Sequence, residues 1–187
     1  YGLSLNIVGI DPTFTLGDMA RQRQETIQRL KDDGVMDMQS SLEIPSLPRR
    51  IAVISSADAA GYGDFCHQLE NNSGGFQFRT QLFAAIMQGE QSAKSIIQSL
   101  QQIADEIDKW DIVVIVRGGG ASTDLRNFDD YELASHCAQF PLPIIAGIGH
   151  TRGISIVDMV VHSSVKTPTA AAEWLINAMQ QQADRIA

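Results

Sequence analysis

The chain has 187 residues, of which 44% are hydrophobic and 19% charged, proportions that are typical of a globular protein and not of a disordered or membrane-embedded one. Its 14 basic and 22 acidic residues give a formal net charge of −8, which argues against a broad basic surface that attracts nucleic acid without specificity. No apolar run approaches the ~18–20 residues that span a bilayer, and the first ten residues do not resemble a signal peptide, so we expect no membrane association.

The N-terminal part of the chain is predicted to hold one strand and one long helix before a linker. Residues 1–10 alternate apolar and polar side chains, as a strand does. Residues 16–30 have the apolar spacing of a helix, with Asp18 in the first turn and Gly34 as its stop. Two prolines within residues 44–50 predict a linker into a new structural unit.

After this linker, short apolar segments alternate with segments of helical periodicity. The predicted strands are 51–56, 76–86, 112–116 and 143–149. The predicted helices are 59–69, 90–107, 127–140, 153–161 and 167–187. Such alternation predicts an α/β fold with a mostly parallel sheet and helices on both faces, doubly wound and Rossmann-like. The N-terminal linker helix and the long C-terminal helix would flank it.

Two of the predicted strands end in glycine beside one charged or titratable side chain. Arg117 precedes Gly118, Gly119 and Gly120, and His150 follows the strand at 143–149. Carboxyl ends of parallel strands share one edge, so Arg117 and His150 should face a common crevice. Glycine amides and an arginine suit a phosphate, and a histidine suits general acid or base catalysis. The alternatives are a tight turn with Arg117 bonded to carbonyls, and a purely structural histidine.

A third predicted strand end supplies hydroxyl groups and a carboxylate. Ser55 and Ser56 end the strand at 51–56, and Asp64 lies in the first half of the next helix, from which it could reach the sheet edge. For Asp64 the alternative is a carboxylate that only faces solvent. The sequence therefore adds Ser56 and Asp64 to the candidate crevice.

Spacings that would indicate a metal or a nucleotide cofactor are absent from the sequence. There is no HExxH and no CxxC, and no acidic pair suggests a dedicated metal cage. The glycine run lacks both the Lys-Ser/Thr of a P-loop and the GxGxxG spacing of a dinucleotide site. Cys66 and Cys137 are predicted to be free thiols in helices, which favours a reducing compartment and a cytoplasmic protein.

Several segments, in the same order along the chain, resemble the signature regions of one family. They are RRIAVISS at 49–56, RGGGASTDLRNFDD at 117–130, PIIAGIGH at 143–150, KTPTAAAEWL at 166–175, and the helical stretch at 10–35. Together they resemble the large subunit of exodeoxyribonuclease VII, a bacterial nuclease of single-stranded DNA. The resemblance covers nearly the whole chain. Several motifs in the same order identify a family more specifically than any single motif does.

The resemblance implies a division of the chain into four parts. Residues 1–12 would be the last strand of an upstream OB-fold that binds single strands, and residues 13–47 its connecting helix and linker. Residues 48–166 would form the α/β nuclease domain. Residues 167–187 would begin a helical, coiled-coil extension that recruits small subunits. The partners implied are single-stranded DNA and the small subunit of the enzyme.

The resemblance also implies roles for particular residues in hydrolysis of DNA to oligonucleotides, a reaction of DNA degradation and repair. Asp64, Arg117 and His150 would be catalytic. Expected contacts to DNA are Ser56, Gly118, Gly119, Gly120, Arg126, Arg152 and Lys166. The family is regarded as able to work without a divalent metal, so no cofactor is required, although Mg²⁺ stays possible.

The chain departs from the family pattern just after His150. Thr151 and Gly153 occupy positions where members commonly carry an acidic residue and an aspartate, while Asp158 matches a later aspartate of the pattern. One alternative is therefore a noncatalytic domain that positions DNA or assembles small subunits. Another alternative, from a different class, is a binding module for a small phosphorylated ligand, with residues 116–120 as its anion loop.

Overall fold

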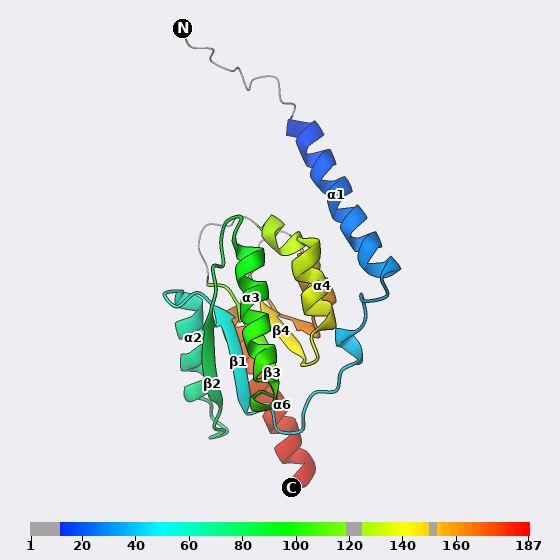
Figure 1. Ribbon diagram of the computed structural model, residues 1–187. Coiled ribbons are helices and arrows are strands. Elements are labelled where there is room, and N and C mark those ends of the chain that lie inside the picture. Colours follow the sequence, from blue (N-terminus) through cyan, green and yellow to red (C-terminus); the bar gives the residue numbers. More distant parts are fainter. Residues whose placement is uncertain (1–11, 119–124, 150–152) are drawn as a thin grey trace.

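A computed structural model describes residues 12–118, 125–149 and 153–187, and these residues form a parallel sheet of five strands (Figure 1). The strands are β1 (Arg50–Ser55), β2 (Arg79–Ala84), β3 (Ile112–Val116), β4 (Ile144–Gly147) and β5 (Ser163–Ser164). The α-helices are α1 (Pro12–Asp32), α2 (Ala60–Glu70), α3 (Ser92–Asp105), α4 (Tyr131–Gln139), α5 (Ile156–Val160) and α6 (Pro168–Ile186). Short 3₁₀ helices are η2 (Gln39–Ser41), η3 (Ile107–Lys109) and η4 (Leu125–Asp129).

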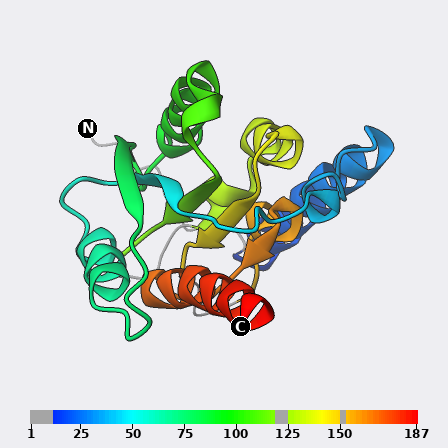
Figure 2. The same cartoon turned by 90° about the horizontal axis from the view of Figure 1, so that it is seen from below.

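Helices cover both faces of the sheet, which confirms the predicted doubly wound α/β fold (Figure 2). One apolar cluster joins the sheet to α3, α4 and α5, and a second joins the opposite face to α2 and α6. All the side chains of β3 are buried because that strand lies between these two layers. This explains why its sequence, IVVIV, is continuously apolar and does not alternate.

The strand order β2-β1-β3-β4-β5 places the reversal of chain direction between β1 and β3. From β1 the chain moves outward to β2 through α2, and it then crosses back through α3 to β3 on the other side of β1. Ile54 of β1 pairs with Ile115 of β3, so the carboxyl ends of these strands are neighbours. The loops that follow them diverge to opposite faces, and ligands of doubly wound proteins bind in the crevice that this leaves.

Helix α1 is attached to the domain by its C-terminal half. Ile27 and Leu30 are buried in the apolar cluster beside α4, and the helix ends where Gly34 adopts a φ of 75°. The helix begins at Pro12, so the expectation that Asp18 lies in its first turn is wrong. The N-terminal end of α1 projects on the side of the molecule where the strands have their carboxyl ends (Figure 1).

Helix α6 is a layer of the α/β domain as well as its last described element. Thr167 caps it by accepting a hydrogen bond from the amide of Ala170, and Pro168 occupies the first turn, as predicted. Ala171, Ala172 and Leu175 are buried against β3, β4 and α2. The small alanines allow the helix to lie close to the sheet.

Other predicted elements needed adjustment. The strand predicted at 76–86 is shorter, the helix predicted at 127–140 is divided into η4 and α4, and the two-residue strand β5 was not predicted. Asp130 causes that division because its side chain caps α4. The strand predicted at residues 1–10 lies outside the described residues.

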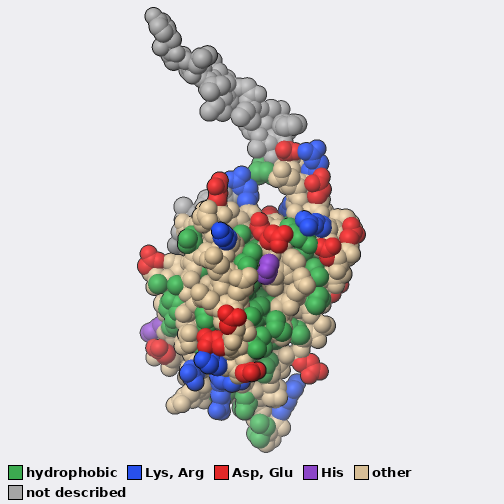
Figure 3. Space-filling model, viewed as in Figure 1, with side chains coloured by type: hydrophobic (Ala, Val, Ile, Leu, Met, Phe, Trp, Pro, Cys, Tyr) green, Lys and Arg blue, Asp and Glu red, His purple; other side chains and the backbone are tan. Residues whose placement is uncertain are grey.

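The visible surface carries interspersed acidic and basic side chains, and no single basic patch dominates it (Figure 3). This distribution agrees with the net charge of −8. Among the described residues, no helix is both long enough and apolar enough to cross a membrane.

Candidate active site

A cleft of about 500 Å³ opens at the carboxyl edge of the sheet, where β1, β2 and β3 end. Its lining comes from the three segments that follow these strands. They contribute Ser56, Asp58, Ala59, Ala60, Ala85, Ile86, Met87, Gln88, Arg117 and Gly118. The cleft therefore lies at the β1/β3 switch point, where the topology predicts a ligand.

Arg117 is the buried cation of this cleft. It directly follows β3, only 8% of its surface is exposed, and its backbone amide donates to the carbonyl of Gly147 at 3.2 Å. Its side-chain Nε is buried without a hydrogen-bond partner among the described residues. An unsatisfied buried donor costs about 1–3 kcal/mol. Among the described residues that line the cleft, Arg117 is the only basic one, so it is the candidate partner of an anion bound there.

Gly118 allows the loop after β3 to touch the start of α2. A Cβ atom on Gly118 would lie 2.4 Å from the backbone nitrogen of Gly61, and a Cβ on Gly61 would lie 2.5 Å from the Cα of Gly118. Neither contact tolerates a side chain, so both positions require glycine. The contact fixes Arg117 relative to the N-terminus of α2.

The end of β4 approaches Arg117 as well. Gly149 adopts a φ of 74°, and a Cβ atom there would lie 3.9 Å from the carbonyl oxygen of Arg117 and 3.5 Å from that of Lys166. Lys166 has an exposed side chain at the start of the segment that leads into α6. The predicted site residues His150 and Arg152 lie outside the described residues, as do Gly119 and Gly120.

The loop after β1 brings hydroxyl groups and one carboxylate to the cleft. Ser55 is fully buried and its hydroxyl has no hydrogen-bond partner among the described residues. Ser56 donates a short hydrogen bond to Asp58. This bond, together with a backbone hydrogen bond, lowers the pKa of the Asp58 carboxyl below its ordinary value. Asp58 is therefore ionised at neutral pH and adds negative charge to the rim.

Two other predicted site residues lie away from the lining of the cleft. Asp64 is exposed on α2, one turn beyond Ala60, and side chains in a helix lean toward its N-terminus. Arg126 belongs to η4, where its Nη1 atom lies 3.4 Å from the sulfur of Met19. The structure thus brings Ser56, Arg117 and Gly118 together, with Asp64 one helical turn away.

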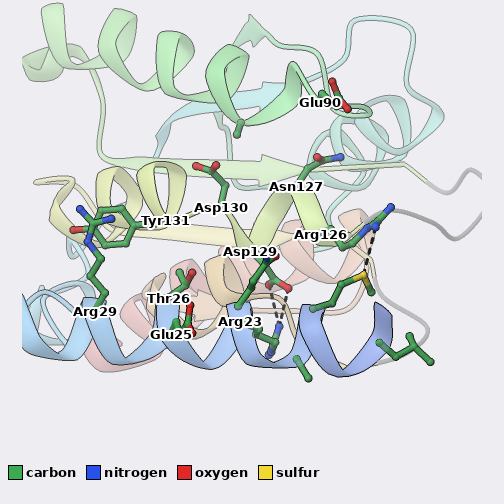
Figure 4. A pocket seen from close by; sticks show the side chains of 15 residues that line it. Arg23, Glu25, Thr26, Arg29, Glu90, Arg126, Asn127, Asp129, Asp130 and Tyr131 are labelled. Carbon is green, nitrogen blue, oxygen red and sulfur yellow. Dashed lines mark hydrogen bonds and ion pairs between the residues drawn. The ribbon is translucent and has the colours of Figure 1, made fainter. Parts of the chain in front are cut away.

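Arg126 lines a second cavity, a groove of about 710 Å³ between α1, η4 and α4 (Figure 4). Arg23 crosses this groove to Asp129, with 2.9 Å between Nη1 and Oδ1, and its Nη2 donates to the carbonyl of Ile154. Asp129 also accepts the amide of Ile156. The charges of the groove are largely engaged in holding α1 to the domain.

Asp158, which matches an aspartate of the family pattern, holds the fold together. Its carboxylate accepts hydrogen bonds from the amide and hydroxyl of Ser155, and from the hydroxyl of Ser164 at 2.6 Å. It therefore closes the N-terminus of α5 and ties this helix to β5. Gly153 is exposed, with a φ of 81° and open space around it. Glycine suits this left-handed conformation, which explains its presence there.

Within residues 12–118, 125–149 and 153–187, no group of three or more His, Cys, Asp or Glu side chains is placed to hold a metal ion. Both cysteines are free, and burial raises the pKa of the Cys137 thiol to about 12. Burial also raises the pKa of the Cys66 thiol, so neither thiol is poised for chemistry.

Sequence reasoning missed the wall of the cleft formed by residues 85–88. These residues follow β2, which pairs with β1 at the edge of the sheet. The strand was predicted to end at residue 86, two residues beyond its observed end at Ala84, so Ala85 and Ile86 were treated as part of it. A signal was present: Gln88-Gly89 ends the apolar run, as a loop does.

Comparison with known proteins yields a family match, several curated relatives and a solved structure. The sequence profile of the family described as "Exonuclease VII, large subunit" matches residues 35–187. Proteins named "Exodeoxyribonuclease 7 large subunit" are similar to the chain: that of Deinococcus radiodurans is 32% identical over 96% of this chain, and that of Nostoc sp. is 34% identical over 89%. The chain spans 44% and 40% of these two relatives. Among solved structures, a lysine decarboxylase of Francisella novicida aligns over 72% of the chain and 17% of its own, with a TM-score of 0.41 and 11% identity.

Proposed function

Because the chain belongs to the exonuclease VII large-subunit family, we propose that it is the catalytic part of a nuclease that hydrolyses single-stranded DNA to oligonucleotides. The observation that carries this proposal is the position of Arg117, which is nearly buried and is the only basic side chain among the described residues that line the cleft at the switch point of the sheet. Arginine binds phosphate oxygens in a forked geometry, so a phosphodiester is the ligand that this position suits best.

In this proposal Arg117 and the amides of Gly118, Gly119 and Gly120 bind the scissile phosphate. They stabilise the charge that accumulates on its oxygens in the transition state, and one preorganised donor of this kind contributes roughly 3–4 kcal/mol. His150 transfers a proton, either from the attacking water or to the leaving oxygen. The support for including His150 is that Gly149, its neighbour in sequence, lies beside Arg117.

Asp64 orients the histidine or the water in this scheme. Its position on α2, one turn beyond the cleft, suits an indirect role. The chemistry needs no resident metal in the proposal, and Mg²⁺ would act by screening the phosphate charge.

Further contacts to DNA come from Ser56, Arg126, Arg152 and Lys166. Since the net charge is −8, most of the affinity for single strands must come from outside this chain. An upstream OB-fold would supply it. The N-terminal end of α1 projects on the side where the strands have their carboxyl ends (Figure 1), and the cleft opens at that edge of the sheet. The helical region beyond residue 167 would bind the small subunit, in the cytoplasm.

A substrate panel tests the proposal. The chain, expressed within its complete gene product together with the small subunit, should release oligonucleotides from labelled single-stranded DNA and leave double-stranded DNA intact. Assays in chelator and in Mg²⁺ should both give product. Absence of product from every substrate in both conditions would reject the proposal.

Substitution of His150 tests the proton-transfer role. His150→Ala should reduce the cleavage rate about 10²–10⁴-fold, which is the usual contribution of a positioned acid or base. His136→Ala is the matched control, since His136 lies on α4 and bonds the carbonyl of Glu132. Cleavage by His150→Ala at the rate of this control would remove the residue from the chemistry.

One observation favours a second function, a noncatalytic domain that positions DNA. Gly153 stands at a position where the family pattern commonly has an aspartate. Its φ of 81° is a conformation that aspartate tolerates better than most residues. Gly153→Asp therefore separates the two functions. A gain of cleavage from an inactive parent would favour the noncatalytic domain, whereas an active parent would exclude it.

A further inference from the structure

One wall of the cleft beside Arg117 is apolar and held firmly in place. Ile86 exposes 54% of its surface, yet its amide donates to the hydroxyl of Ser95 at 2.8 Å. The amide of Ala85 donates to the carbonyl of Ser55 at 2.9 Å, and Met87 is 5% exposed because it packs into the core. Ile86 and Met87 thus form a fixed shelf, which we call the β2 shelf.

The opposite wall of the cleft offers donors for an anion. Arg117 lines this wall and contributes its guanidinium. Ala60, the first residue of α2, lines the same wall, and Ala59 before it provides no side-chain cap. The positive end of the helix and the guanidinium therefore face the same space.

The distance between the two walls suits a single nucleotide. β1 separates β2 from β3, so the shelf and Arg117 are two strand spacings apart, or about 10 Å. The cleft volume of about 500 Å³ lies within the usual range for small-ligand sites. A phosphate at one wall and a base at the other would fill it.

We infer that this cleft binds one nucleotide of the substrate strand, with its phosphate against Arg117 and Ala60 and its base on the β2 shelf. The inference rests on the proposed nuclease function and specifies how that site holds its substrate. Apolar contact reads no base edge, so the subsite accepts all four bases. Asp58 at the rim repels the phosphate and favours release of the product.

Titration of the chain with small probes tests this inference. By NMR or calorimetry, deoxyadenosine and thymidine 5′-monophosphates should bind with dissociation constants within about threefold of each other. Deoxyadenosine alone should bind at least tenfold more weakly because it lacks the phosphate, as expected when a charge-assisted contact is lost. Absence of binding, or binding of one base alone, would overturn the inference.

Two variants locate the nucleotide on the shelf. Ile86→Ser should weaken monophosphate binding roughly five- to tenfold, as expected for losing apolar contact area, and leave the binding of inorganic phosphate unchanged. Leu47→Ser is the control, because Leu47 is also exposed, at 46%, but precedes β1 outside the cleft. Asp58→Asn should tighten monophosphate binding by removing a like charge. Equal affinities for the Ile86→Ser, Leu47→Ser and unaltered chains would overturn the placement.

Cleavage assays distinguish failure of the inference from failure of the proposed function. In the complete enzyme, Ile86→Ser should raise KM for single-stranded DNA with little change in kcat, because the shelf contacts substrate away from the reacting bond. If the Ile86→Ser enzyme is active and its KM is unaltered, the inferred nucleotide subsite is rejected and the proposed nuclease function is retained. If monophosphates bind on the β2 shelf but the complete enzyme cleaves no substrate, the proposed nuclease function is rejected and the inferred nucleotide subsite is retained.

Discussion

Arg117 and Asp158 are both charged and nearly buried, with 8% and 6% of their surfaces exposed, but their surroundings differ. Asp158 has its carboxylate satisfied by Ser155 and Ser164, as a structural charge requires. The Nε of Arg117 has no such partner among the described residues. Asp158 therefore holds the fold, whereas Arg117 lines the cleft and is the candidate anion-binding residue.

Removal of Asp158 should therefore affect stability first. Asp158→Ala deletes a capping box and the tie to β5, and should lower the free energy of unfolding by about 2–3 kcal/mol. Urea unfolding measures this change. Glu173→Ala, which alters an exposed carboxylate on α6, is the control. If Asp158→Ala lowers the free energy of unfolding no more than Glu173→Ala does, the structural role of Asp158 is contradicted.

At the scale of elements, the site depends on how α2 meets the loop after β3. Gly61 and Gly118 are in backbone contact, and a Cβ on Gly61 would also lie 2.8 Å from the ring of Pro168 in α6. Three elements thus meet where two glycines allow it. Gly63, two residues further along the same helix, has open space around it.

This difference gives paired predictions for one helix. Gly61→Ala should destabilise the protein by about 1–3 kcal/mol because backbone must move to admit the methyl group. Gly63→Ala should stabilise it by about 0.5–1 kcal/mol because alanine favours a helix interior. Thermal unfolding of both variants checks the signs. Shifts in the same direction would show that the contact between α2 and the loop does not constrain the fold.

Much of the fold could be predicted because its elements are separated by clear signals. The strand at 112–116 was predicted with its exact bounds, since five apolar residues between polar ends have few alternatives. β2 was harder to delimit, because an edge strand is covered less and its burial alternates irregularly. β5 consists of two serines, whose sequence carries no strand signal.

The candidate site was predictable only in part, for a related reason. Arg117 and Ser56 follow buried strands, so the parallel topology brings them to one edge. The β2 shelf depends on strand order, because β2 could have lain elsewhere in the sheet. The distance of Arg126 from the cleft depends on the packing of α1 against η4, which no local pattern encodes.

At the scale of the whole molecule, the two edges of the sheet have different tasks. At the carboxyl edge, the hydroxyl of Ser55 and the Nε of Arg117 are buried without partners among the described residues. At the amino edge, Asp111 accepts the amides of Arg49 and Arg50 and the guanidinium of Arg50 at 2.7 Å. Changes at the amino edge should therefore alter stability and leave activity unaltered, whereas changes at the carboxyl edge should alter activity.

The pH dependence of stability should reveal the amino-edge contact. Burial raises the pKa of Asp111, but the hydrogen bonds from Arg50 and Arg49 and the charge of Arg50 outweigh it, so the pKa is lowered. The stabilisation that the Asp111 carboxylate contributes is fully present above its unfolded-state pKa of about 3.9. It is lost as the pH falls through its folded-state pKa.

Asp111→Asn should accordingly lower the urea midpoint at pH 7, and the difference from the unaltered protein should shrink at about pH 3, below the unfolded-state pKa. Cleavage kinetics should not change. A difference in midpoint that is the same at both pH values would show that the charge of Asp111 contributes nothing.

The most direct test of the central claim is the single-turnover rate of single-stranded DNA cleavage by the complete enzyme carrying Arg117→Ala. Arg79→Ala, at the amino end of β2, removes the same charge from an exposed position and serves as the control. The account predicts that Arg117→Ala reduces the rate about 10²–10³-fold while DNA binding and the folded spectrum persist. A rate equal to that of Arg79→Ala would contradict the assignment of the carboxyl-edge cleft as the catalytic site.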